Sequence, residues 1–195
     1  MKTVIYMVRH AESPYTEGTE RTRGLTIKGK GDVEKVTEIL KKEEIDVIIS
    51  SPYNRAILSV EGLAQYLGLD IKTFEDLRER YFAGEIIDNA ELMSAINEKF
   101  YDFEYSLPGG ESNFDCQNRS MSVLKNILKE HSGKKIAIGT HGLVMTLMMN
   151  YFDSSYGLDF LNQLKKPDIY KLIFEDLELK EVIRLWDEDF GLNYH

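Results

Sequence analysis

Six short segments of the chain are rich in β-branched and aromatic residues, the composition typical of β-strands. These segments are residues 2–8, 45–49, 71–74, 135–138, 169–174 and 180–185. Helical patterns alternate with them, which predicts an α/β fold: a mostly parallel sheet with helices on both faces. The last two segments are close enough in sequence to form a hairpin, so we expect one antiparallel edge strand.

Between these segments, apolar residues recur at the three- or four-residue spacing of helices that pack one face against a core. The spacing predicts three helices, one on Val33, Val36 and Leu40, one on Ala56, Val60, Leu63 and Leu67 with Gly68 as the stop, and one on Leu92, Ile96 and Phe100. Ser112 and Asp115 have the spacing of a capping box and predict a fourth helix, which carries Met121, Leu124 and Leu128. Residues 142–149 predict a short, buried helix.

Length and composition narrow the possible functions. The 195 residues, 43% of them hydrophobic, fit one domain spanning residues 1–195. With 33 acidic and 24 basic residues the formal net charge is −9, which disfavours nucleic acid or an anionic membrane as a partner. Any bound anion must be held by a few basic side chains gathered locally. Cys116 is the only cysteine, so we expect no intrachain disulfide and a cytoplasmic setting, and the apolar run 4–8 is too short for a signal peptide or membrane span.

Chemically versatile side chains follow the predicted strands at their carboxyl ends. In a doubly wound sheet these ends share one edge, where ligands bind. Four strands deliver two arginines, two histidines and a carboxylate there: Arg9 and His10, Arg55, Glu79, and His141. Each motif alone has a plain structural explanation, such as a solvated Arg-His pair, a helix start with Ser51 as N-cap and Pro52 at the first helical position, or a strand-to-helix turn. Their shared position at one edge favours a functional site.

Six sequence blocks follow one another along nearly the whole chain. They are Val8-Arg9-His10-Ala11-Glu12-Ser13, Leu25-Thr26 with Gly29, Ser50-Ser51-Pro52 with Arg55-Ala56, Leu77 with Glu79, Gly109-Gly110-Glu111-Ser112 with Arg119, and Thr140-His141-Gly142. As a set, the blocks resemble the histidine phosphatase superfamily, also called phosphoglycerate mutase-like proteins. The chain departs from the family pattern at Ala11, where glycine is usual, and at Thr16, where many members carry a phosphate-binding asparagine. A hydroxyl of Thr16 or Ser13 could supply the missing contact.

The residues at the predicted edge suit phosphoryl transfer, which needs in-line positioning and stabilisation of charge on the equatorial oxygens. We expect Arg9 and Arg55 to bind the non-bridging oxygens with their planar donor groups, and His141 to act as a third donor. A neutral His10 imidazole can attack phosphorus and form a phosphohistidine. The resemblance implies that Glu79 is the general acid, which protonates the leaving oxygen and then activates water.

Further contacts to the substrate are expected from the loops beside these residues. Ser13, Thr16 and Gly142 are candidate substrate-binding residues, and Arg21 and Arg23 are candidates for a second anionic group, although exposed arginines are also ordinary. Residues 81–111 predict a cover segment over the site. Lys99 is the only basic residue within it, so it offers little charge support for a bisphosphorylated intermediate. Its aromatic residues indicate either simple packing or a pocket for an apolar or planar part of an organic phosphate.

The resemblance favours a phosphomonoester hydrolase, with a cofactor-dependent phosphoglycerate mutase as the alternative reaction. Another alternative is a catalytically silent regulator that binds a phosphorylated ligand, but the retained ionisable groups argue against it. A metal-dependent hydrolase could use His10, Glu12 and His141 as ligands, but Arg9 and Arg55 would repel the cation. The sequence therefore predicts a metal-independent phosphatase without a cofactor, acting on a phosphorylated small molecule. No sequence feature indicates the oligomeric state.

Overall fold

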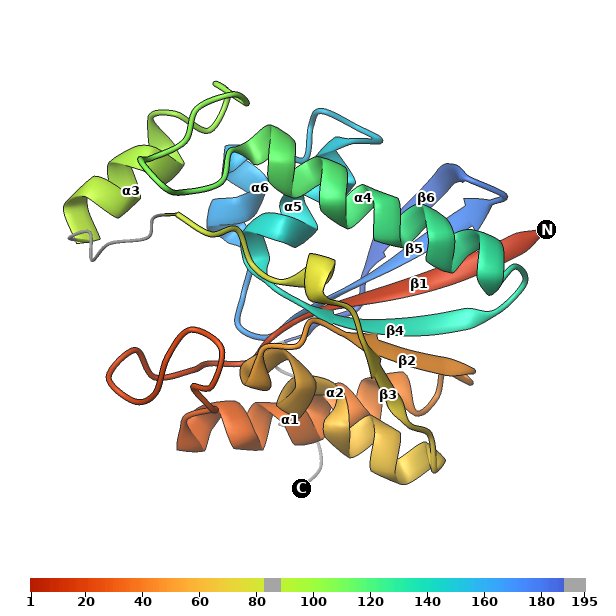
Figure 1. Cartoon of the computed structure of the whole chain (residues 1–195). Coiled ribbons are helices and arrows are strands. Elements are labelled where there is room, and N and C mark those ends of the chain that lie inside the picture. Colours follow the sequence, from red (N-terminus) through yellow and green to blue (C-terminus); the bar gives the residue numbers. More distant parts are fainter. Residues whose placement is uncertain (83–88, 188–195) are drawn as a thin grey trace.

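The computed structural model describes residues 1–82 and 89–187 and contains one six-stranded sheet (Figure 1). The strands lie in the order β3-β2-β4-β1-β5-β6. Their bounds are β1 Lys2–Arg9, β2 Val47–Ser50, β3 Ile71–Thr73, β4 Lys135–Thr140, β5 Asp168–Glu175 and β6 Glu178–Arg184. Each predicted strand is confirmed to within two residues at either end, and so is the mixed α/β fold class.

The antiparallel part of the sheet differs from the expected arrangement. Strands β1, β2, β3 and β4 pair in parallel, and β5 and β6 form the predicted hairpin. The strand that runs against its neighbours is β5, however, and it lies inside the sheet between β1 and β6. Arg9, the last residue of β1, pairs with Asp168, the first residue of β5. After β4 the chain comes back to the edge of the sheet where the parallel strands end. Because β5 starts at that edge, it runs antiparallel to β1.

Helices cover both faces of the sheet (Figure 1). Helices α1 (Ile27–Leu40) and α2 (Asn54–Leu67) lie on one face, and α4 (Asn113–Glu130), α5 (Gly142–Asn150) and α6 (Leu158–Gln163) lie on the other. The central strand β1 contributes side chains to the core on both faces of the sheet, because successive side chains of a strand point to opposite faces. Tyr6 and Val8 pack in the cluster with α1 and α2, whereas Ile5 and Met7 pack in the cluster with α4 and α5.

Helix ends follow the local sequence signals, with one exception. Ser112 and Asp115 form the predicted capping box of α4, and Gly68 ends α2 in the left-handed conformation at φ 66°. The explanation of the Ser51-Pro52 motif as a helix cap is wrong: Tyr53 is the N-cap of α2, and the helix begins at Asn54. The Ser51 hydroxyl has other partners, described below.

Two short elements and one boundary were not predicted. Helix α6 and the 3₁₀ turn η1 (Glu75–Leu77) are too short for an apolar period to appear. Helix α3 (Asn89–Asn97) ends before Phe100, which is fully buried in the turn that follows. None of the helices in the described ranges is both long and apolar enough to cross a membrane.

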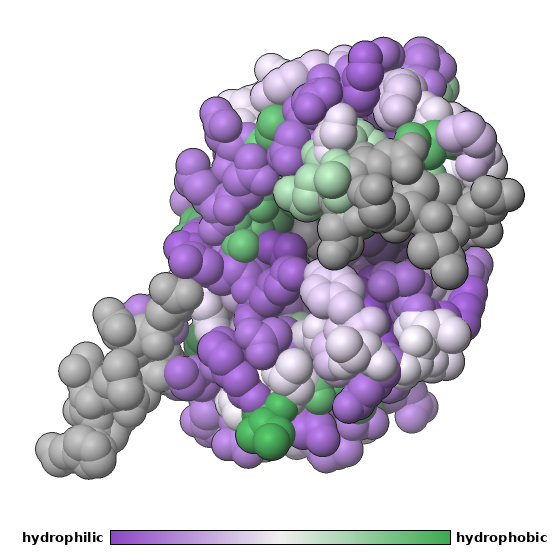
Figure 2. Space-filling model, turned by 90° about the vertical axis from the view of Figure 1, so that its left-hand side faces the viewer, coloured by the Kyte–Doolittle hydropathy of each residue, from purple (hydrophilic) through white to green (hydrophobic). Residues whose placement is uncertain are grey.

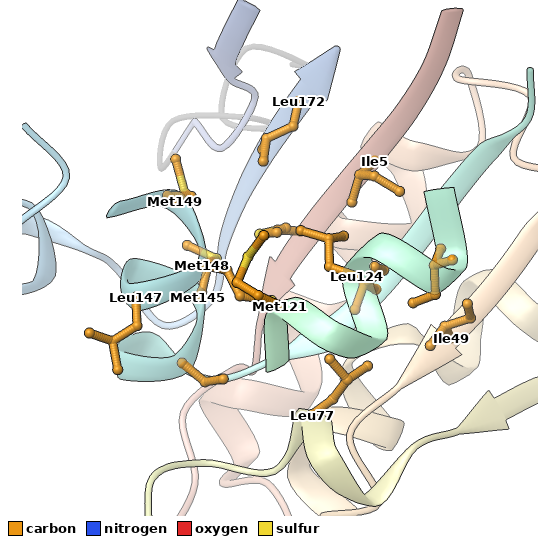
Figure 3. Packing of buried hydrophobic residues seen from close by; sticks show 14 of the residues in the cluster. Ile5, Ile49, Leu77, Met121, Leu124, Met145, Leu147, Met148, Met149 and Leu172 are labelled. Carbon is orange, nitrogen blue, oxygen red and sulfur yellow. The ribbon is translucent and has the colours of Figure 1, made fainter. Parts of the chain in front are cut away.

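Helix α5 is apolar on all sides and is enclosed between the sheet and α4. Figure 3 shows Met145, Met148 and Met149 of α5 beside Met121 and Leu124 of α4. A helix that is hydrophobic all round must be buried, as this one is. Because α5 directly follows β4, its amino-terminal N–H groups are held at the edge where the parallel strands end.

Candidate active site

His10 lies directly after β1, and its ring is fixed by two hydrogen bonds. The ring Nδ1 lies 2.7 Å from the Ala11 carbonyl oxygen, which can only accept, so Nδ1 carries the proton. Nε2 is then the basic nitrogen, and it accepts a hydrogen bond from Nε of Arg55 at 3.2 Å. Burial, followed by the positive charge of Arg55, holds the pKa of His10 well below its usual value. The ring is therefore a neutral imidazole with a lone pair on Nε2.

His141 lies behind His10 and is fully buried. Its ring centroid is 5.3 Å from that of His10, and its Nε2 lies 2.7 Å from the Ser51 hydroxyl. The Ser51 oxygen accepts the backbone N–H of Tyr53 at 3.2 Å, and in one of the two His141 tautomers the Ser51 hydroxyl donates its hydrogen to Nε2. The proton of His141 then resides on Nδ1, which has no hydrogen-bond partner within the described residues.

Arg55 reaches His10 from the start of α2 and is 1% exposed. Its two terminal nitrogens contact the same residue: Nη1 donates to the backbone carbonyl of Glu20, and Nη2 donates to the Glu20 carboxylate at 3.0 Å. Arg23 binds that carboxylate from the other side, with Nε 3.0 Å from Oε1. A carboxylate of the chain itself thus lies between two arginines, one of which is bonded to the His10 imidazole.

Arg9 extends from the last position of β1 and has spare donor capacity. Its Nη1 donates to the Leu164 carbonyl at 2.8 Å, whereas its Nε is buried without a partner in the described part of the chain. The guanidinium lies against Gly142, where a Cβ atom would come within 2.9 Å of Cζ. Glycine at this position is what allows Arg9 to approach the amino terminus of α5. Burial lowers the pKa of Arg9, and the nearby Glu79 charge acts in the opposite direction.

The Glu79 carboxylate lies at the amino terminus of α5. Its Oε1 accepts the backbone N–H groups of Val144 at 3.0 Å and Arg80 at 2.9 Å, and its Oε2 accepts that of Leu143 at 3.2 Å. Helix amino termini favour a negative group in this position. Oε1 accepts two backbone N–H groups and Oε2 accepts one, so Oε2 has more acceptor capacity left for a further partner.

The backbone that carries Glu79 is held from α4. Arg119 donates to the carbonyls of Arg78 at 3.0 Å and Glu79 at 3.3 Å. The same guanidinium forms a two-point ion pair with Glu111, at 2.5 and 2.8 Å. A bidentate ion pair fixes direction as well as distance, so Glu111 orients Arg119 toward the backbone of Glu79. This explains why the Gly-Gly-Glu-Ser block and Arg119 accompany Glu79 in the sequence.

These side chains border one cavity of about 940 Å³ at the carboxyl edge of the sheet. Figure 2 looks onto this side of the molecule, where hydrophilic residues predominate and smaller hydrophobic areas lie between them. Arg9, His10, Arg55 and Glu79 all line the cavity, and His141 lies directly behind His10. An apolar part of the wall comes from α3, α5 and α6: Leu92, Met93, Ile96, Leu143 and Leu161.

The five predicted substrate-binding residues lie in different surroundings. Arg23 lines the cavity, and Gly142 packs against Arg9. Ser13 donates its hydroxyl hydrogen to the Gly24 carbonyl at 2.6 Å, so this hydrogen is already engaged. Thr16 is exposed, and Arg21 forms an exposed ion pair with Glu75 at 2.5 Å. In the described part of the chain, neither Thr16 nor Arg21 belongs to the cavity wall.

The cover segment borders the cavity through Tyr81, Phe82 and helix α3, while residues 83–88 of the predicted 81–111 range lie outside the described residues. Sequence reasoning missed several residues of the cavity wall, among them Tyr15, Glu20, Lys165 and Lys166. The two lysines precede Pro167 at the start of the hairpin, and a basic pair next to a strand carries no distinctive signal. Glu20 belongs to a Glu-Arg-Thr-Arg run that is typical of a solvated loop.

Comparison with known proteins adds an independent finding. Residues 5–179 match the histidine phosphatase superfamily (branch 1). Phosphoglycerate mutase-like protein 4 of Arabidopsis thaliana is 29% identical over 156 residues, covering 72% of this chain and 67% of that protein. Phosphoserine phosphatase 1 of Hydrogenobacter thermophilus is 26% identical over 157 residues, covering 74% and 73%. The structure of an Entamoeba histolytica phosphoserine phosphatase in complex with 3-phosphoglyceric acid superposes with a TM-score of 0.76 at 21% identity, covering 95% of this chain and 98% of that one.

Proposed function

Because the chain belongs to the histidine phosphatase superfamily, we propose that it hydrolyses small organic phosphomonoesters through a phosphohistidine on His10. The observation that carries the proposal is the state of His10. Its Nε2 is unprotonated, and Arg55 donates a hydrogen bond to it in a cavity that Arg9 and Glu79 also line. This arrangement joins a nucleophile to cations that suit the charge of a phosphoryl group.

In the first step, Arg9, Arg55 and His141 Nδ1–H bind the non-bridging oxygens of the ester. A bond forms between His10 Nε2 and phosphorus while the bond to the ester oxygen breaks. Glu79 gives its proton to that oxygen, and the alcohol leaves. We assign this proton to Oε2, which accepts one backbone N–H, whereas Oε1 accepts two.

In the second step, a water molecule attacks the phosphorus of the phosphohistidine. Glu79, now a carboxylate, takes the proton of the water, and the bond between phosphorus and Nε2 breaks. Inorganic phosphate leaves, and His10 and Glu79 return to their starting states. The same acid thus serves both steps in opposite directions, as an acid and base shared by two successive steps must.

Substrate binding must compete with Glu20, because its carboxylate engages Arg55 and Arg23 in the empty site. We predict that Glu20→Gln lowers the inhibition constant for vanadate by about two- to fivefold. The size is modest because the Glu20 side chain is 62% exposed, and exposed ion pairs contribute roughly 0–1 kcal/mol. Glu17→Gln, in the same exposed loop, is the matched control. Unchanged or weaker vanadate binding by Glu20→Gln would show that Glu20 does not compete with the phosphoryl group.

Hydrolysis is the reaction that we propose, in preference to phosphoglycerate mutase activity. The cover segment supports this choice, because Lys99 is its only basic residue. Other parts of the cavity wall carry Arg23, Lys165 and Lys166, so the cavity as a whole is not poor in positive charge. We further propose that residues 1–195 act as one domain, with 81–111 as the cover of its site. The single, buried Cys116 supports a cytoplasmic setting.

The experiment is a phosphate-release assay with a panel of phosphorylated metabolites, before and after exhaustive chelation. We expect release from small esters to persist after chelation and to exceed interconversion of phosphoglycerates primed by bisphosphoglycerate. Efficient mutase turnover would replace hydrolysis by transfer. Loss of release on chelation, restored by zinc or magnesium, would overturn the metal-independent mechanism.

A further inference from the structure

A second cluster of positive charge lies in the cavity wall opposite the cover segment. Lys166, in the loop between α6 and β5, donates to the Tyr15 hydroxyl at 3.2 Å. Its ammonium nitrogen is 5.6 Å from the Tyr15 ring centroid, and the Arg23 guanidinium is 4.6 Å from the same centroid. Two cations therefore flank one aromatic ring, and all three side chains line the cavity.

The pKa of Tyr15 reflects the two positive charges beside its ring. Desolvation of the phenol acts to raise its pKa, but the charges of Lys166 and Arg23 outweigh this effect, and the pKa lies below the usual value. Arg23 is already paired with Glu20. Lys166 contacts a neutral phenol and forms no ion pair within the described residues, so its charge is available to a ligand.

This cluster is close to the phosphoryl site. Arg9 donates to the carbonyl of Leu164 at 2.8 Å, which ties the loop that carries Lys166 to the end of β1. Lys166 is also among the cations that lower the pKa of His10, after burial, Arg55 and Arg9. A small molecule whose phosphoryl group contacts His10 can therefore also reach Lys166.

We infer that Lys166 and Tyr15 bind a second anionic group of the substrate, a carboxylate or a second phosphate. Because the Tyr15 oxygen accepts from Lys166, its own hydrogen is left to donate to that anion. The inference rests on the proposed function and names its substrate class: phosphomonoesters whose remainder carries a further negative charge.

The test measures competitive inhibition of p-nitrophenyl phosphate hydrolysis by two matched pairs of compounds. Glycerol 3-phosphate and 3-phosphoglycerate differ by a carboxylate, and fructose 6-phosphate and fructose 1,6-bisphosphate differ by a second phosphate. For Lys166→Gln we expect the inhibition constant of the member with the second anionic group, in at least one pair, to rise about tenfold, the value of one charge-assisted hydrogen bond. The inhibition constant of the member without a second anionic group should change by less than about threefold. The pair that responds identifies the second group as carboxylate or phosphate.

Lys180→Gln, which removes an ion pair with Glu178 on β6, controls for the loss of one positive charge. The inference is overturned if Lys166→Gln still hydrolyses p-nitrophenyl phosphate and its inhibition constants change equally for both members of each pair, or change for no compound. If the wild-type protein hydrolyses no ester, the proposed function fails instead. Calorimetric binding of 3-phosphoglycerate and fructose 1,6-bisphosphate to both variants then tests the subsite without turnover.

Discussion

The His10→Ala variant is expected to lose phosphatase turnover by at least about 10⁴-fold, the scale on which deletion of a catalytic nucleophile acts. Alanine removes Nε2, the atom that is proposed to bond to phosphorus. The imidazole itself is poised for this role, because the Ala11 carbonyl fixes its proton on Nδ1 and burial beside Arg55 keeps it neutral. Arg9, Arg55 and His141 remain, so the variant should still bind vanadate or phosphate.

Folding must be separated from chemistry in this variant. Arg55 loses its contact to Nε2 but keeps both contacts to Glu20, so we expect the far-ultraviolet circular dichroism spectrum to be retained. His131→Ala, at the C-cap of α4, is the matched control and should retain activity. Near-normal hydrolysis by folded His10→Ala would remove His10 as the nucleophile.

The Glu79→Gln variant is expected to show a defect that depends on the leaving group. An alkoxide needs a proton as its bond to phosphorus breaks, whereas nitrophenolate is a stable anion and hardly needs one. General acid catalysis contributes about 10²- to 10⁴-fold, so phosphoenzyme formation from an alkyl phosphate should slow by that order. The same step with p-nitrophenyl phosphate should be much less affected.

Rapid-quench measurement of the first step is required, because the proposed mechanism also has Glu79 activate the water that hydrolyses the phosphohistidine. Steady-state rates would report that second step for both esters. Glutamine retains a carbonyl oxygen for the N–H groups of α5, and Glu75→Gln, four residues away in η1, is the matched control. If the first step slows equally for both esters, or for neither, Glu79 is not the acid.

The sheet and the meeting point of the candidate catalytic residues could be predicted from local patterns. Buried strands have continuous apolar runs, and the carboxyl ends of parallel strands converge whatever the loops between them do. Arg9 ends such a strand and His10 follows it directly, so their position depends little on loop detail. The direction of β5 depends instead on the route of residues 141–167, which has no periodic signature.

The charged partners within the cavity could not be predicted in the same way. Glu20 and Arg55 are 35 positions apart, and Lys166 and Tyr15 are 151 positions apart. Each pair joins loops whose conformation is set by tertiary packing, and single charged residues in loops are usually solvated. Glu20 consequently has the sequence surroundings of an ordinary surface acid, although it binds the arginine that contacts His10.

The most direct test of the proposed mechanism is to trap the phosphoenzyme. Wild-type protein is mixed with a ³²P-labelled ester, quenched within milliseconds in alkali, digested and analysed by mass spectrometry. A phosphoramidate on histidine survives alkali and is lost in acid, so we predict an alkali-stable, acid-labile label on the peptide that contains His10. The label should form and decay fast enough to account for turnover. Steady hydrolysis without such a label, or a label on any other residue, would contradict the account.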